Sequence, residues 1–338
     1  MNANAFGDKF KISISGASHD DYMSVAISGM SKGISIDYDL IDYDLSRRRP
    51  KYAFDTPRIE KDEYIIVSGE DNGTTTGEEI KVVIKNKSID NKPYTDISNI
   101  YRPSHADYTW EVKTGQPLSA GGGILSARET VLRVIAGAFA KMLLKEKLNN
   151  MIEFYTWVHS VGEIFAPDYE PEISSQMQQY LTKIKTDGDS IGGSVRCVVK
   201  HIPAGIGEPV FNKIHAVLAY ALMSIPAAKA FEVGRGVEAS FMKGSEHNDP
   251  YKYDETEHKI IPAKNDAGGV LGGITTGEDI ILTVYFKPIS SILKEQHSVD
   301  KDGKPVSFSV GGRHDVCAAI RAVAVVEAMT AIVIANFI

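Results

Sequence analysis

Apolar and polar residues alternate in several short stretches of the chain, which is the pattern of strands with one buried face. The first stretch is residues 10–15, where Phe10, Ile12 and Ile14 alternate with polar neighbours. Residues 195–199 repeat this alternation around Cys197. Further short apolar stretches predict strands at residues 23–29, 64–67, 80–84, 153–158 and 280–286.

The clearest helix is predicted behind Ser126 and Glu129, which have the S-x-x-E spacing of a capping box. Apolar residues from Val131 to Leu143 then recur every three or four positions, so they share one helical face. Other helices are predicted at residues 35–48, with Asp37 near the start, and at 174–185, 209–223 and 315–336.

These elements mix helices and strands without a regular βαβ rhythm. No boundary carries a linker rich in proline, glycine and serine, so we expect one domain over residues 1–338. Gly-rich pieces at residues 192–193 and 268–273 each precede a predicted strand, which suggests a repeated architecture.

The composition fits a soluble protein with a large core, since 43% of the 338 residues are hydrophobic. The net charge of −7 argues against nucleic-acid binding, because that needs a basic face. Cys197 and Cys317 lie far apart, which favours free thiols in a reducing compartment.

The most apolar segment, residues 316–338, is interrupted by Arg321 and Glu327. Its longest uncharged run is about half of the ~20 residues that span a bilayer, so we expect a buried helix and no membrane association. Residues 1–10 have no apolar stretch typical of a signal peptide. The expected location is the cytoplasm.

Four cations occur within residues 46–51, namely Arg47, Arg48, Arg49 and Lys51. Guanidinium groups match the geometry of phosphate and carboxylate, so one interpretation is an anion site. The alternative is a solvated helix end, where cations also interact favourably with the helix dipole.

Two glycine-rich segments allow close backbone approach to a ligand. Residues 120–126 lead into the predicted capped helix, whose N-terminus attracts anions. Residues 268–273 are the second such segment. The alternatives are a flexible loop for the first and a tight turn between strands for the second.

Three histidines, His19, His105 and His314, lie in polar turn sequence. Histidine is the natural acid–base group near neutral pH, although most loop histidines are simply exposed. No metal-ligand spacing is present, and residues 247–258 are interpreted as a charged loop. Taken alone, these residues fit either an enzyme acting on a phosphorylated metabolite or a non-catalytic nucleotide-binding protein.

Taken in order, ten segments of the chain resemble the chorismate synthase family. They include Arg-Arg-Arg-Pro at 47–50, Arg-Pro-Ser-His-Ala-Asp at 102–107, Ser-Ala-Arg-Glu-Thr at 126–130 and Gly-Arg-His-Asp at 312–315. The others are residues 16–19, 207–211, 221–225, 267–273, 287–288 and 321–323. Together they span residues 7 to about 330, so the resemblance covers nearly the whole chain.

The resemblance implies an α+β fold, a β-α-β sandwich with helices between two antiparallel sheets, assembled as a homotetramer. It also implies reduced FMN as cofactor and 5-enolpyruvylshikimate 3-phosphate as substrate. The reaction would be a 1,4-anti elimination of phosphate that gives chorismate, in the shikimate pathway of aromatic amino acid biosynthesis. The chain has no added dinucleotide motif, so we expect reduced flavin to come from outside.

The same resemblance implies roles for individual residues. His19 would protonate the departing phosphate, His105 would support the reduced flavin, and Asp315 with Ser18 would relay a proton from flavin N5. Four arginines would hold substrate and flavin anions: Arg48, Arg102, Arg128 and Arg313. The flavin pocket would be lined by Ser126, Ala127, Ala227, Gly272, Lys287, Ser290, Ser291 and Arg313.

The chain departs from the family pattern at Ala17, Asp20 and residues 51–54 and 114–125. Phe54, Pro117 and Ala120 stand where the resemblance implies arginines. Two hypotheses follow: a working chorismate synthase, or a catalytically impaired homologue that keeps the fold, with or without flavin binding. If these positions face the ligand, turnover should be weak, and Phe54→Arg with Asp20→Gly should raise kcat/KM.

Overall fold

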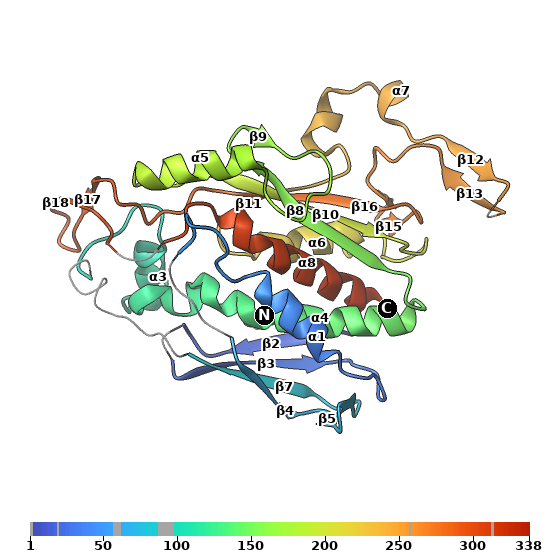
Figure 1. Ribbon diagram of the computed structural model, residues 1–338, viewed down its shortest axis with the longest axis horizontal. Coiled ribbons are helices and arrows are strands. Elements are labelled where there is room, and N and C mark those ends of the chain that lie inside the picture. Colours follow the sequence, from blue (N-terminus) through green and yellow to red (C-terminus); the bar gives the residue numbers. More distant parts are fainter. Residues whose placement is uncertain (1–2, 19, 57–61, 87–97, 257, 312–313) are drawn as a thin grey trace.

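The computed structural model describes residues 3–18, 20–56, 62–86, 98–256, 258–311 and 314–338. Within these residues the chain forms two five-stranded antiparallel sheets with helices between them (Figure 1). The first sheet has the order β1 (Ala5–Phe6), β2 (Lys11–Ser15), β3 (Tyr22–Ser28), β7 (Ile80–Lys85) and β4 (Tyr64–Ser68). The second has the order β11 (Ala228–Val233), β16 (Ile280–Phe286), β10 (Gly193–Lys200), β8 (Glu153–Val161) and β9 (Ile164–Phe165). The expected sandwich of two sheets is confirmed.

The layer between the sheets is built around two long helices, α4 (Thr130–Lys147) and α8 (Ala318–Phe337). The helix α1 (Tyr38–Ser46) packs against α4, and α6 (Ile214–Met223) packs against α8 and β11. The helix α5 (Ser175–Thr186) lies on the outer side of the second sheet (Figure 1).

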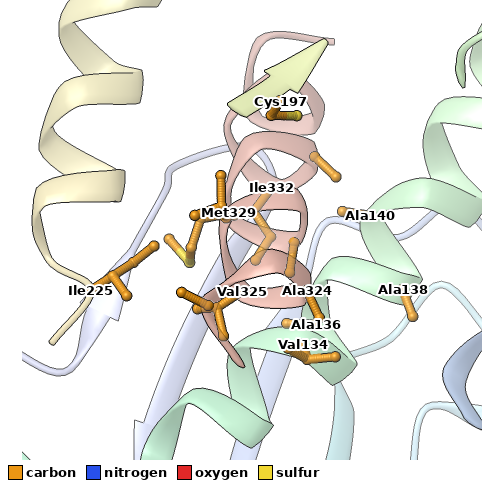
Figure 2. Close-up of a cluster of buried hydrophobic side chains, with 14 of the residues drawn as sticks. Val134, Ala136, Ala138, Ala140, Cys197, Ile225, Ala324, Val325, Met329 and Ile332 are labelled. Atoms are coloured by element: carbon orange, nitrogen blue, oxygen red, sulfur yellow. The ribbon is translucent and has the colours of Figure 1, made fainter. Parts of the chain in front are cut away.

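Helix α8 is mostly apolar because most of it is enclosed by the rest of the protein. By length and composition it is long and apolar enough to cross a membrane, yet 78% of its most apolar window is buried inside the protein. Figure 2 shows Val325, Met329 and Ile332 of this helix among side chains from α4, from β10 and from the end of α6. The expectation of a buried helix is confirmed.

Helices α4 and α8 approach closely at Gly137. A Cβ atom at this position would lie 2.3 Å from the Cβ of Ala328 on α8, which is far inside van der Waals contact. Glycine is therefore required here by the packing of the two helices, although it is a poor residue for a helix interior.

A network of three buried charges and the half-buried Arg47 joins α1, α4 and α8. Glu327 accepts two hydrogen bonds from Arg47, at 2.7 and 2.8 Å, and one from Lys141 at 2.9 Å. Lys141 also lies 2.5 Å from a carboxylate oxygen of Asp44. Burial raises the pKa of Glu327, but the charges of Lys141 and Arg47 more than offset this effect and hold its pKa at about 2.

The two halves of the chain repeat the same order of elements. The sequence β2, β3, α1, β4, β7, α4 in the first half matches β8, β10, α6, β11, β16, α8 in the second. The corresponding strands also occupy corresponding places in their sheets. The structure therefore contains a repeat of the first half by the second. It does not relate the glycine-rich pieces at 192–193 and 268–273 that suggested one, because both lie in the second half, before the non-equivalent strands β10 and β16.

A shared motif marks the repeat in sequence, 200 residues apart. Residues 69–80 and 269–280 both follow the pattern Gly-x-x-x-Gly-x-Thr-Thr-Gly-Glu-x-Ile. The first threonine of each pair, Thr75 or Thr275, donates a hydrogen bond of 2.7 Å to a loop carbonyl, that of Ser31 or Pro203. Its hydroxyl also accepts from a backbone amide in the same loop, at 3.0 and 2.9 Å respectively.

Shorter elements complete the described chain. Short helices are α3 (Asp107–Thr114), η1 (Ala120–Leu125), η2 (Ala127–Glu129), η3 (Gly236–Phe241) and α7 (Gly244–His247). Short hairpins are β5–β6 (Glu70–Asp71, Thr74–Thr75), β12–β13 (Tyr251–Asp254, Lys259–Pro262), β14–β15 (Val270–Leu271, Ile274–Thr275) and β17–β18 (Gln296–Val299, Pro305–Phe308).

All the predicted strands, and the helices at 35–48 and 174–185, are confirmed with small changes at their ends. The helix predicted at 209–223 begins only at Ile214, since Val210 has a φ of 62°, which a right-handed helix cannot contain. Similarly, α8 begins at Ala318 because Cys317 is extended. Residues 247–258 are not one loop, because β12 begins within them.

The start of α4 also differs from prediction. The glycine-rich residues, for which a flexible loop was the alternative to a ligand site, belong to the 3₁₀ helix η1. The Ser126 side chain caps η2 by accepting from the Arg128 amide at 3.4 Å. Glu129 instead accepts from Arg133 at 2.9 Å, so the predicted capping box is wrong.

Candidate active site

A cavity of about 560 Å³ opens at one end of the helical layer. The segments that follow α1 and α6 line it, together with those that lead into α4 and α8. Because each helix N-terminus leaves amide groups unpaired and carries positive potential, the starts of α4 and α8 favour an anionic ligand. The volume is in the range of small-molecule sites.

The cavity wall is rich in cations and has few acids. Among the described residues, its cationic side chains are Arg48, Arg49, Arg102, Arg128, Lys287 and Arg321, and its carboxylates are Asp62 and Asp315. Apolar surface comes from Leu118, Leu125, Ile225, Pro226, Ile289 and Val325. The arrangement suits a ligand that combines several negative charges with a flat apolar part.

Arg48 is held at the end of α1 by the rest of that helix. Asp37 caps the helix start by accepting from the Leu40 amide at 2.9 Å, and Arg47 joins the buried network. Arg48 is 5% exposed and donates to Thr130 Oγ1 at 2.9 Å. Burial lowers the pKa of Arg48 to about 10, with Asp62 opposing this shift, so the guanidinium stays charged at neutral pH.

Arg128 and Arg48 meet at the carboxylate of Asp62. One oxygen of Asp62 pairs with Arg128, and the other lies 3.5 Å from a nitrogen of Arg48. Arg128 also donates to Asn86 at 3.4 Å. These contacts join the start of α4 to the end of α1 at the cavity wall.

His105 is a neutral imidazole with a defined tautomer. Nδ1 lies 3.0 Å from the carbonyl of Pro103, and Nε2 lies 3.0 Å from Ser291 Oγ. Because a carbonyl only accepts, Nδ1 carries the proton and Nε2 accepts from the Ser291 hydroxyl. Burial and the charge of Arg102 lower the pKa of His105, which keeps the ring neutral at neutral pH.

The loop that carries His105 is fixed from both sides. Arg102 forms a two-pronged contact with Asp107 at 2.6 and 2.7 Å. The Ser104 carbonyl accepts from Lys287 at 3.4 Å and from Ser290 at 3.2 Å. Burial lowers the pKa of Lys287, and nearby Lys229 adds to this effect.

Asp315 is held at the start of α8 by Arg321, which donates to it at 2.8 Å, and by the Thr56 amide at 3.2 Å. Arg321 also donates to the carbonyl of Arg48 at 2.8 Å, and so links α8 to the end of α1. His314 also lines the cavity, and burial lowers its pKa.

Most of the residues that the sequence assigned to the site come together here. Those lining the cavity are Arg48, Arg102, His105, Ser126, Ala127, Arg128, Ala227, Lys287, Ser290, Ser291 and Asp315. His19 and Arg313 lie outside the described residues. Two others are elsewhere: Ser18 is buried below η1, where its amide lies 3.4 Å from the Gly123 carbonyl, and Gly272 lies in the β14–β15 turn. Arg49, Asp62, His314 and Arg321 line the cavity without having been assigned to it.

Two of the altered positions do not face the cavity as predicted, whereas Leu118 and Leu125 of the altered segment 114–125 do line it. Phe54 is 3% exposed and stacks on Tyr52 at 5.0 Å between ring centroids, so it belongs to the core. Pro117 is exposed and is not among the residues lining the cavity. The side chain of Ala120 is outside the described residues. Changes at Phe54 and Pro117 therefore remove no cation from the described wall.

Comparison with known proteins gives one consistent family. A family model described as chorismate synthase matches residues 10–338. The chorismate synthase of Prochlorococcus marinus (strain MIT 9211) is 42% identical, over 98% of this chain and 96% of the relative. That of Christiangramia forsetii is 41% identical, over 100% and 98% respectively. A crystal structure of chorismate synthase matches with a TM-score of 0.76 at 25% identity, over 98% of this chain and 92% of the other.

Proposed function

The chain belongs to the chorismate synthase family, and from that membership we propose that it eliminates phosphate from 5-enolpyruvylshikimate 3-phosphate, with reduced FMN as cofactor. The cation-rich cavity between two helix N-termini is the observation that carries the proposal. This substrate has two carboxylates and a phosphate, so its binding requires several cations in one enclosed site.

The substrate anions would be held mainly by the arginines at the helix ends. Arg48 and Arg128 lie on one side of the cavity, and Arg102 with His105 comes from a separate loop. Arg313 and His19 keep the roles that the family resemblance implies, as anion binder and as acid for the departing phosphate. Fixed cations of this kind stabilise the negative charge that builds on a leaving phosphate.

The described residues also fit a flavin. Leu118, Leu125, Ile225 and Pro226 offer apolar surface to a flat ring, and Lys287 offers a cation to its phosphate. Further contacts would come from Ser126, Ala127, Ala227, Ser290 and Ser291. Reduced FMN, when bound, would lend electron density to the substrate while phosphate leaves.

Two protein groups would handle protons beside that ring. His105 presents a neutral imidazole whose tautomer is set by Pro103 and Ser291. Asp315 is fixed by Arg321 and would hold a proton near flavin N5. Ser18 and Gly272 gain no support from the geometry of the single chain.

We also propose that the protein is a homotetramer in the cytoplasm. Several large apolar side chains are exposed on the arm formed by η3, α7 and the β12–β13 hairpin (Figure 1), among them Val237, Phe241 and Ile260. Phe211 is 89% exposed and Phe241 is 84% exposed, which is unusual for a surface that faces only water. Light scattering tests this, and a monomer at working concentration would contradict it.

An anaerobic assay with chemically reduced FMN tests the function. We expect chorismate and inorganic phosphate in equal amounts, and neither product with oxidised FMN. Arg128→Ala should lower kcat/KM by about tenfold or more, since a hydrogen bond to a charged group contributes roughly 1.5–3 kcal/mol. Absence of chorismate under these conditions, with flavin bound, would favour an impaired homologue instead.

A further inference from the structure

Asp62 is an acid placed where a ligand anion is expected. Its side chain is 5% exposed and lies between Arg48 and Arg128 on the cavity wall. The other carboxylate on the described wall, Asp315, is already bound to Arg321 and the Thr56 amide. Asp62 is thus the acid that faces the two cations at the ends of α1 and α4.

The cations around Asp62 repel one another. The positive charges of Arg321 and Arg128 both contribute to lowering the pKa of Arg48, in addition to its burial. Buried like charges are costly without a counter-charge, because little water screens them. In the protein without ligand, the carboxylate of Asp62 supplies that counter-charge.

Asp62 satisfies Arg48 only in part. Its oxygen is 3.5 Å from the Arg48 nitrogen, which is at the long limit for a hydrogen bond. Among the described residues, the buried Nε of Arg48 has no hydrogen-bond partner. A carboxylate has two oxygens, whereas a phosphate offers three or four in a tetrahedral arrangement. A phosphate group would therefore complete donors that Asp62 leaves unmet.

We propose that Asp62 is a positioning residue that acts as an internal counter-anion, holding Arg48 and Arg128 in place until the phosphate of a ligand replaces it between them. This rests on the proposed function only for the identity of the ligand. The exchange has two consequences. Asp62 keeps the arginines ordered in the empty site, and it competes with the incoming phosphate, so that the product phosphate is released readily.

Calorimetric titration with inorganic phosphate tests the exchange directly. Asp62→Asn keeps the shape and removes the charge, so phosphate should bind at least threefold more tightly than to the unaltered protein. Glu172→Gln is the matched control, since it removes one negative charge from a half-exposed pair with Lys51. The phosphate Kd of this control should stay within about twofold of that of the unaltered protein, because an exposed ion pair contributes little free energy.

Steady-state kinetics give a second readout. In Asp62→Asn both KM for the phosphorylated substrate and kcat should fall, because phosphate leaves more slowly. An unchanged or weaker phosphate Kd in this variant overturns the proposal, as does a rise in KM. If Asp62→Asn does not fold, Asp62→Glu retains the charge with a longer reach, so its phosphate Kd should be equal or weaker. A tighter Kd there would also overturn the exchange.

The two proposals fail separately. If the protein makes no chorismate but shows the expected order of phosphate affinities, the proposed function fails and the counter-anion role stands. If the enzyme makes chorismate and Asp62→Asn binds phosphate with the same Kd as the unaltered protein, only the counter-anion role fails.

Discussion

Replacing Lys141 by methionine should destabilise the protein strongly. Lys141 neutralises two buried carboxylates, Asp44 and Glu327, from distances of 2.5 and 2.9 Å. Its side chain is 8% exposed, and those of the two acids are 3% and 6% exposed. Methionine has a similar shape, so the main change is the loss of one charge from the network.

The expected loss follows from the charges left behind. In Lys141→Met the two carboxylates would share only Arg47. Removing one partner of a buried ion pair costs about 3–5 kcal/mol, because the remaining charge is neither solvated nor paired. Since domains are typically stable by about 5–15 kcal/mol, much of the total stability would be lost. Asp44→Asn added to Lys141→Met should recover part of it.

Denaturant unfolding followed by circular dichroism at pH 7 measures this loss. The control is Lys294→Met, which removes a cation from a pair with Asp189 whose lysine side chain is 52% exposed. Exposed pairs contribute about 0–1 kcal/mol, so this variant should unfold nearly as the unaltered protein does. Equal stability of the two variants would refute the argument from burial.

Three further predictions concern the core and the cavity. Phe54→Arg should lower the free energy of unfolding without raising kcat/KM, because it forces a charge into a position that is 3% exposed. A rise in kcat/KM would show that residue 54 faces the active site. Activity should fall toward acid pH as His105 gains a proton, and this limb should lie below the ordinary pKa of histidine, because burial and the charge of Arg102 lower the pKa of His105. Arg102→Gln should raise that pKa and move the acid limb to higher pH, so an unmoved limb in the pH–rate profile would exclude His105 as its source. Gly137→Ala should cost about 1–3 kcal/mol in denaturant unfolding through overpacking, whereas Gly244→Ala, with no neighbour within 4 Å, should be tolerated.

The elements were predictable because burial leaves a period in the sequence. Strands such as β2 and β10 alternate between buried and less buried residues. In α4 the apolar residues recur every three or four positions, but every residue from Thr130 to Leu144 except Arg133 is buried, so the helix is enclosed on more than the one predicted face. Helix starts were less predictable. They depend on the backbone conformation of single residues, such as the φ of 62° at Val210. The pattern of apolar and polar residues does not predict such a conformation.

The site was predictable where its residues lie in ordered motifs, as with Arg48, His105 and Arg128. Arg321 was missed because its segment was interpreted as a buried helix, and Asp62 because it lies in a segment without any recognised motif. Only the fold brings both to the cavity wall. Phe54 shows the opposite error. Alignment with a motif assigned it a function, but not the direction of its side chain, which points into the core.

The repeat also bears on the ancestry of the site. The cavity lies where the ends of α1 and α6 meet the starts of α4 and α8, and these are corresponding positions in the two halves. A duplicated ancestor would have had two equivalent rims there. Today one rim carries Arg48 and Arg49, and its counterpart carries Ile225 and Pro226. Corresponding segments of the two halves thus give the cavity one cationic rim and one apolar rim.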